Sequence, residues 1–155
     1  MTTVVVADDQ PLIRSSLRAL LDDAPDIEVV AEAGDGEEAV RAVVRHRPDV
    51  VVMDVRMPRM DGLEATKVIR RDHPGTAVVV LTTYDVDEYV FRAVRAGASG
   101  FLLKDGDADE LVRGVRAAVS GESVVAPLSL RALLDEFART PQPAPDAVVR
   151  VDRLS

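Results

Sequence analysis

Five short apolar runs alternate with five stretches whose apolar residues recur at helical spacing, and this alternation strongly constrains the fold. The central run, Val50 to Met53, is apolar without interruption, as is typical of a strand covered by helices on both faces. Short right-handed crossovers between such strands predict a parallel sheet. Because five units are too few to close an eight-fold barrel, we expect an open, doubly wound α/β sheet. The expected strands are 2–7, 27–33, 50–54, 77–81 and 100–103.

Helix boundaries are marked by turn and cap residues. Pro11 suits the first turn of a helix, where its missing N–H is no loss. The later helices begin with an aspartate that has a glutamate three residues on, the pattern of a capping box, at Asp35, Asp61, Asp85 and Asp107. Gly97 is expected to end the fourth helix in the left-handed conformation. The helices should bury the apolar stripes Ile13-Leu17-Leu20-Leu21, Ala39-Val40-Val43-Val44, Leu63-Ala65-Val68-Ile69, Val86-Val90-Ala93-Val94 and Leu111-Val115-Ala118-Val119.

Composition limits what the chain can bind. A length of 155 residues suits one domain with a real core, and a net charge of −8 argues against a direct grip on nucleic-acid phosphates. Without cysteine there are no disulfides or thiolate metal sites, and His46 and His73 are interpreted as residues at helix carboxyl ends. No apolar run is long enough to span a bilayer and no signal peptide is evident, which predicts a cytoplasmic protein without a membrane partner.

Polar side chains follow four of the expected strands. Because the carboxyl ends of parallel strands meet at one edge of a sheet, these side chains should lie close together. Three carboxylates in one place repel unless a cation neutralises them, and oxygen ligands favour Mg²⁺ or Mn²⁺. With a hydroxyl and an ammonium beside them, the set suits an aspartate that accepts a phosphoryl group. The residues are Asp8, Asp9, Asp54, Thr82, Thr83 and Lys104.

Several sequence segments together resemble the receiver domain of bacterial two-component response regulators. They are Asp8-Asp9, Met53 to Gly62, Leu81-Thr82 and Phe101 to Lys104, and the resemblance covers about residues 1–122. The segments 81–84 and 96–105 are similar to the NarL/FixJ subclass, whose second domain is a LuxR-type helix-turn-helix. The resemblance implies a flavodoxin-like five-stranded sheet of order 2-1-3-4-5 with five flanking helices.

The remaining residues are interpreted as a connection to that second domain. Leu130, Leu133, Leu134 and Phe137 mark a sixth helix over about 127–139, within a linker segment 123–139. Residues 140–155 begin as a proline-rich, semi-rigid spacer. On this interpretation the DNA-binding domain is absent from the chain, and the linker helix serves either as a spacer or as part of a dimer.

The resemblance also implies roles for individual residues. Asp54 would be the phosphoacceptor. Asp9, Asp54 and the backbone carbonyl of Arg56 would bind Mg²⁺ directly, with Asp8 acting mostly through water. Lys104 would pair with the phosphoryl oxygens.

A two-state switch follows from the same resemblance. Thr82 would turn toward the phosphoryl group and Phe101 would move inward into the vacated space, because only the phosphorylated state offers the extra acceptors. A sensor histidine kinase would donate the phosphoryl group, a homodimer would form on phosphorylation, and DNA would be bound only through the absent domain. The protein would be no enzyme beyond its own phosphoryl transfer and autodephosphorylation. Autodephosphorylation would be slow, because bulky Arg56 and Tyr84 flank the attacking water.

Three other interpretations are open to test. An aspartyl phosphatase would need a second acid two residues after Asp54, where Arg56 stands. A flavin-binding module would need a Gly/Ser/Thr-rich loop after the first strand, and Asp8-Asp9 would repel its phosphate. A degenerate receiver could act as a scaffold alone.

Two local features stay open on the resemblance. Many receivers have proline where this chain has Asp105, which leaves the loop geometry there open. Tyr89 and Phe91 are either exposed rings or part of a receiver pairing surface.

Overall fold

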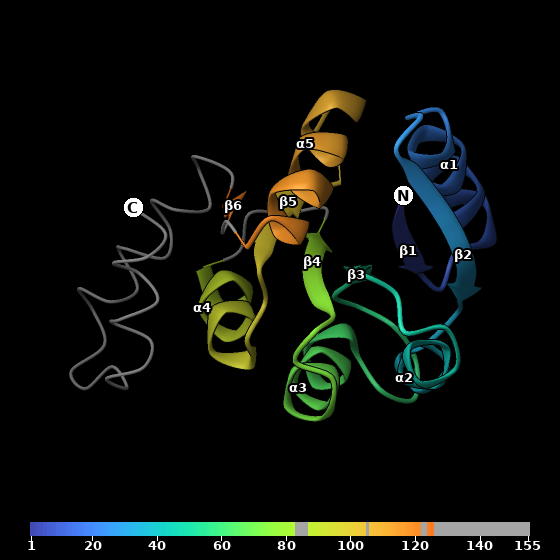
Figure 1. Ribbon diagram of the computed structural model, residues 1–155. Coiled ribbons are helices and arrows are strands. Elements are labelled where there is room, and N and C mark those ends of the chain that lie inside the picture. Colours follow the sequence, from blue (N-terminus) through green and yellow to red (C-terminus); the bar gives the residue numbers. More distant parts are fainter. Residues whose placement is uncertain (83–86, 105, 122–123, 126–155) are drawn as a thin grey trace.

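The computed structural model describes residues 1–82, 87–104, 106–121 and 124–125 (Figure 1). Within these ranges no helix has the length and apolar character needed to cross a membrane. In chain order the elements are β1 (Thr2–Ala7), α1 (Pro11–Asp22), β2 (Ile27–Ala33), α2 (Gly36–His46), β3 (Val50–Asp54), α3 (Gly62–Asp72), β4 (Ala77–Thr82), α4 (Asp87–Ala96), β5 (Gly100–Leu103), α5 (Ala108–Val119) and β6 (Val124–Val125).

All strands of the sheet are parallel, in the order β2-β1-β3-β4-β5-β6. The first five strands confirm the doubly wound, flavodoxin-like order. The sixth was not expected: Val124 and Val125 pair with Gly100 and Phe101, within the segment 123–139 that the sequence interpretation assigned to the linker. Two residues are too few for any periodicity to reveal a strand. The expected helix over 127–139 and the spacer over 140–155 lie outside the described residues.

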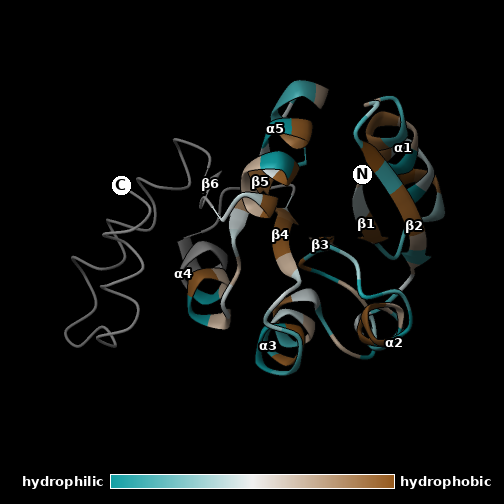
Figure 2. Ribbon diagram, viewed as in Figure 1, coloured by the Kyte–Doolittle hydropathy of each residue, from teal (hydrophilic) through white to brown (hydrophobic). Residues whose placement is uncertain are grey.

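The alternation of side chains along each strand divides the core into two layers. One layer joins Val5, Val51 and Val80 to α2, α3 and α4. The other joins Val52 and Leu81 to α1 and α5, which lie together on the opposite face of the sheet (Figure 1). In Figure 2 apolar residues concentrate on the strands, while the helices carry both apolar and polar positions. The sheet is thus covered on both faces, which explains its nearly unbroken valine runs.

Three residues assigned to buried stripes are instead exposed. The exposed fractions are 41% for Leu20, 56% for Val44 and 44% for Val119. Val44 and Val119 each follow a buried residue, and Leu20 precedes one, so each is rotated by about 100° from its neighbour around the helix. Helical spacing alone could not decide which of two adjacent apolar residues faces the sheet.

The expected helix ends are largely confirmed. Pro11 is the first residue of α1, His46 is the last of α2, and His73 caps the carboxyl end of α3. Gly97 has φ of 98°. The carboxylates of Asp35, Asp61 and Asp107 each accept a hydrogen bond of 2.8 Å from the backbone N–H three residues on. Asp85 lies outside the described residues.

Replacing Asp107 by alanine is expected to lower the free energy of unfolding by about 1 kcal/mol, because α5 would lose its N-cap acceptor. Asp107→Ser, which keeps a side-chain oxygen, should lose only a few tenths of that amount. Urea unfolding followed by circular dichroism measures both variants. Equal losses for the two would contradict a capping role.

Candidate functional site

The carboxyl ends of the central strands carry the expected polar residues. Asp8 and Asp9 directly follow β1, Asp54 ends β3, Thr82 ends β4 and Lys104 directly follows β5. Strand register brings these positions together: Asp54 lies beside Leu81, and Thr82 beside Leu103. The tertiary structure therefore places the aspartates, Thr82 and Lys104 at one edge of the sheet. Thr83, Tyr84, Asp105 and the side chains of Tyr89 and Phe91 lie outside the described residues.

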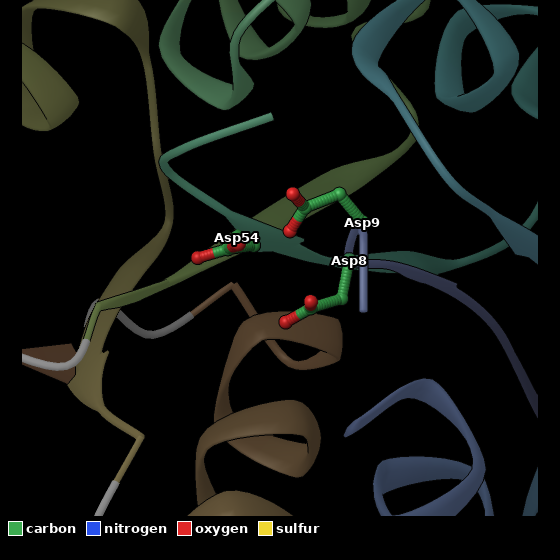
Figure 3. A group of neighbouring side chains, drawn as sticks. All are labelled: Asp8, Asp9 and Asp54. Atoms are coloured by element: carbon green, nitrogen blue, oxygen red, sulfur yellow. The ribbon is translucent and has the colours of Figure 1, made fainter. Parts of the chain in front are cut away.

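The three aspartates form a compact acidic cluster. One carboxylate oxygen from each of Asp8, Asp9 and Asp54 lies within 4.8 Å of the others (Figure 3). Asp8 is fully buried and Asp54 is 7% exposed, whereas Asp9 is open to solvent. Solvent therefore reaches the cluster on the side of Asp9, while Asp8 and Asp54 are covered by protein.

Lys104 carries positive charge into this cluster. Its Nζ lies 2.6 Å from Asp8 Oδ2 and 3.3 Å from Asp54 Oδ1, and its side chain is 14% exposed. Burial opposes the charged form, but the contacts with Asp8 and Asp54 outweigh that effect and raise the pKa of Lys104. Lys104 therefore stays an ammonium between two carboxylates at neutral pH.

Burial raises the pKa of Asp54 to about 6, and the negative charges of Asp8 and Asp9 add to this effect. Lys104 lowers the same pKa, yet one ammonium does not offset three carboxylates. The cluster consequently holds an excess of negative charge in a largely buried place.

The donor set fits a divalent cation of the magnesium type. Asp8 Oδ1 accepts a hydrogen bond of 2.9 Å from Gln10 N–H. Asp8 Oδ2 is buried, and its partner is the Lys104 ammonium, whose Nζ lies 2.6 Å away. An oxygen in this position can accept from a water bound to the cation. Carboxylate oxygens with a backbone carbonyl and waters are the ligands that Mg²⁺ prefers.

The two residues predicted to form the switch, Thr82 and Phe101, are both buried. Thr82 is 5% exposed, and its carbonyl accepts a 2.6 Å hydrogen bond from Lys104 N–H. Phe101 is 1% exposed and belongs to the core layer beneath α3 and α4. A cleft of about 430 Å³ opens beside the cluster, with Asp9, Arg56 and Pro58 in its walls. A donor group can approach the acidic cluster from this cleft.

Sequence reasoning missed how the loop between β3 and α3 is held. Gly62 N–H donates to Val55 O at 2.8 Å, and a Cβ at Gly62 would lie 1.8 Å from Asp54 O. The loop also contacts the start of α2, where Gly36 N–H donates to Met60 O at 2.9 Å. A glycine after Met60-Asp61 could have signalled the first close approach. Gly36 is a signal of the same kind, since a Cβ there would lie 2.2 Å from Met60 O, but a glycine does not show which distant segment approaches it.

Residues 4–116 match the response regulator receiver domain family. The chain belongs to this family. The receiver domain is 43% identical over 139 residues to the transcriptional regulatory protein YxjL of Bacillus subtilis, covering 90% of this chain and 64% of that protein. It is 38% identical over 136 residues to the transcriptional regulatory protein DegU of Brevibacillus brevis, covering 88% and 58%.

Solved structures agree with this assignment. A LuxR-family two-component response regulator from Aurantimonas superposes on the receiver domain with a TM-score of 0.83 at 33% identity, covering 89% of this chain and 99% of that one. The signal receiver domain of NarL from Mycobacterium tuberculosis gives a TM-score of 0.76 at 37% identity, covering 78% and 98%. The protein is thus a receiver domain of a two-component response regulator related to the NarL and LuxR regulators. It spans about 58–64% of the length of the curated relatives it matches.

Proposed function

We propose that this receiver domain is a phosphorylation-dependent switch that accepts a phosphoryl group on Asp54 from a sensor histidine kinase in a magnesium-dependent reaction. The observation that carries the proposal is the cluster of Asp8, Asp9 and Asp54 paired with Lys104 at the carboxyl edge of the sheet. Family membership supports it, since receiver domains are signalling domains and generally bind Mg²⁺ at an acidic pocket. We also propose that the protein acts in the cytoplasm.

Three groups would hold the metal directly: the carboxylates of Asp9 and Asp54 and the backbone carbonyl of Arg56. Asp8, which already contacts Lys104, would act mostly through a bound water. Bound Mg²⁺ supplies positive charge that offsets the carboxylates and the incoming phosphoryl oxygens.

In the transfer step an oxygen of Asp54 forms a bond to phosphorus while the nitrogen–phosphorus bond of the kinase's phosphohistidine breaks. The imidazole leaves with the electron pair of that bond. Lys104 is 3.3 Å from Asp54 Oδ1 before transfer, so its ammonium needs only a small movement to contact the phosphoryl oxygens. Deprotonated Asp54 is required as the nucleophile, and its pKa of about 6 leaves most of it ionised at neutral pH.

The readout is proposed to involve Thr82 and Phe101. After transfer, the Thr82 hydroxyl gains a phosphoryl oxygen as an acceptor, and Phe101 moves inward into the space that Thr82 leaves. Because the Phe101 ring is already buried, this movement would be a rearrangement inside the protein and not an entry from solvent. The switch would control formation of a homodimer, and transcription through an attached DNA-binding domain.

Incubation with acetyl phosphate and Mg²⁺, followed by intact-protein mass spectrometry, tests the proposal. We expect a single phosphoryl adduct on the wild-type protein and none on Asp54→Asn, because an amide cannot serve as the nucleophile. Chelation of Mg²⁺ before acetyl phosphate is added should prevent formation of the adduct. No adduct on the wild type would support a scaffold, and turnover of a phosphomonoester would support a phosphatase. After removal of free acetyl phosphate, with Mg²⁺ still present, we expect the adduct to persist for minutes, and a lifetime of seconds would contradict slow autodephosphorylation.

A further inference from the structure

The loop between β3 and α3, residues 55–61, lies against the amino terminus of α2 (Figure 1). Backbone hydrogen bonds hold it at two points, from Gly62 N–H to Val55 O at 2.8 Å and from Gly36 N–H to Met60 O at 2.9 Å. The loop carries Arg56, whose carbonyl is a proposed metal ligand. Its conformation therefore decides where that carbonyl points.

Arg59 occupies an unusual backbone conformation within this loop. Its φ is 66°, in the left-handed region that residues with a Cβ rarely adopt. The Arg59 side chain extends to the start of α2, where Nε donates to Asp35 Oδ2 at 2.8 Å. The left-handed backbone and the ion pair with Asp35 thus occur together in this loop.

Asp35 is a fixed partner for this ion pair. Its side chain is 2% exposed, and Oδ1 caps α2 by accepting from Glu38 N–H at 2.8 Å. Glu38 in turn accepts from Gly34 N–H at 2.9 Å, which braces the turn from the other side. The hydrogen bond from Glu38 N–H and the contact with Arg59 lower the pKa of Asp35, so it stays charged at neutral pH. A single buried carboxylate thus serves both the helix and the loop.

We propose that Asp35 and Arg59 are positioning residues for the metal site: their ion pair keeps residue 59 left-handed and so directs the Arg56 carbonyl toward the acidic cluster. The inference rests on the proposed function, because it concerns the magnesium site assigned to Asp9, Asp54 and Arg56. Neither Asp35 nor Arg59 contacts the metal in this proposal. They act through the backbone of the loop.

Charge alone predicts the opposite effect, which makes the inference testable by the sign of the change. Removing a cation from the neighbourhood of an acidic cluster strengthens binding of Mg²⁺. If the conformation of the loop affects the metal site more than the charge of Arg59 does, removing the ion pair between Arg59 and Asp35 weakens binding of Mg²⁺. Arg41 provides a matched control, since it is an exposed arginine of α2 close enough to Asp35 to lower its pKa.

The test measures the dissociation constant of Mg²⁺ by isothermal titration calorimetry with no phosphodonor present. We expect Arg59→Ala to weaken binding about tenfold, the lower end of the loss that follows removal of residues that orient metal ligands. Arg59→Gly should recover most of the loss, because glycine adopts the left-handed conformation without the ion pair. Arg41→Ala should bind as the wild type does or slightly more tightly. Arg59→Ala binding as tightly as the wild type, or more so, would overturn the inference.

Hydrogen exchange of the metal-free protein provides a second readout that does not depend on metal binding. We expect the amides of residues 56–61 to exchange faster in Arg59→Ala and in Asp35→Asn, which keeps a capping oxygen but loses the charge. Unchanged exchange in both variants would also overturn the inference. If the wild type binds no Mg²⁺ at all, the proposed function fails, and the metal-positioning role fails with it. If the wild type binds and Arg59→Ala binds equally, only the positioning role fails.

Discussion

Gly62→Ala is expected to lower the free energy of unfolding by about 3 kcal/mol and to weaken binding of Mg²⁺. A Cβ at this position would lie 1.8 Å from Asp54 O and 2.8 Å from Asp54 C, which are backbone atoms of the strand that carries the proposed phosphoacceptor. The strand is hydrogen-bonded on both sides and cannot give way, so either α3 or the end of β3 must move. Urea unfolding measures the loss of stability, and titration calorimetry measures the loss of metal affinity.

Gly75→Ala is the matched control for this prediction. No atom lies within 4 Å of a Cβ built at Gly75, and its φ is not in the left-handed region. We expect its unfolding free energy to stay within about 1 kcal/mol of the wild-type value. A Gly62→Ala variant as stable as Gly75→Ala would show that the contact with Asp54 relaxes at little cost.

Asp54→Asn is expected to stabilise the metal-free protein by about 2 kcal/mol at pH 7.5 and by little at pH 4 or below. In the folded protein burial raises the pKa of Asp54 to about 6, above the value of about 4 in an unfolded chain. Between these two values the folded state binds more protons than the unfolded state. The wild-type protein therefore loses stability as the pH rises from about 4 to about 6, and asparagine, which does not ionise, avoids this loss.

Urea unfolding in the presence of EDTA, at several pH values from 4 to 8, measures this difference. The control is Asp72→Asn, because a hydrogen bond from Arg71 lowers the pKa of Asp72. A lowered pKa stabilises the folded state at pH values above the pKa of the same group in the unfolded chain, and this stabilisation is lost as the pH falls. Asp72→Asn should therefore be less stable than the wild type at neutral pH. A difference between Asp54→Asn and the wild type that does not grow with pH would contradict the raised pKa.

Local sequence patterns were sufficient to predict the order of the elements from β1 to α5. The valine run before Asp54, the proline at the first turn of α1 and the aspartate caps at Asp35, Asp61 and Asp107 all act within a few residues, so the sequence encodes them directly. The edge where the acidic residues would meet was predictable too, because parallel strands bring their carboxyl ends together. In the structure Asp8, Asp9, Asp54, Thr82 and Lys104 do lie at this edge.

Other features depend on segments far apart in the chain. The exposure of Val44 and Val119 depends on which side of each helix contacts the sheet, and β6 depends on the position of β5 beside it. The ion pair between Arg59 and Asp35 joins residues 24 apart, across the contact of α2 with the loop that follows β3.

The sequence by itself determined the α/β fold, the helix ends and the residues gathered at the sheet edge, since these follow from backbone propensities and from side-chain spacing. Only the tertiary structure decided how Lys104 divides its charge between Asp8 and Asp54, and that Arg59 of the loop after β3 pairs with Asp35 at the start of α2. Both depend on distances of a few ångströms between separate elements, and such distances are set by the packing of the whole domain.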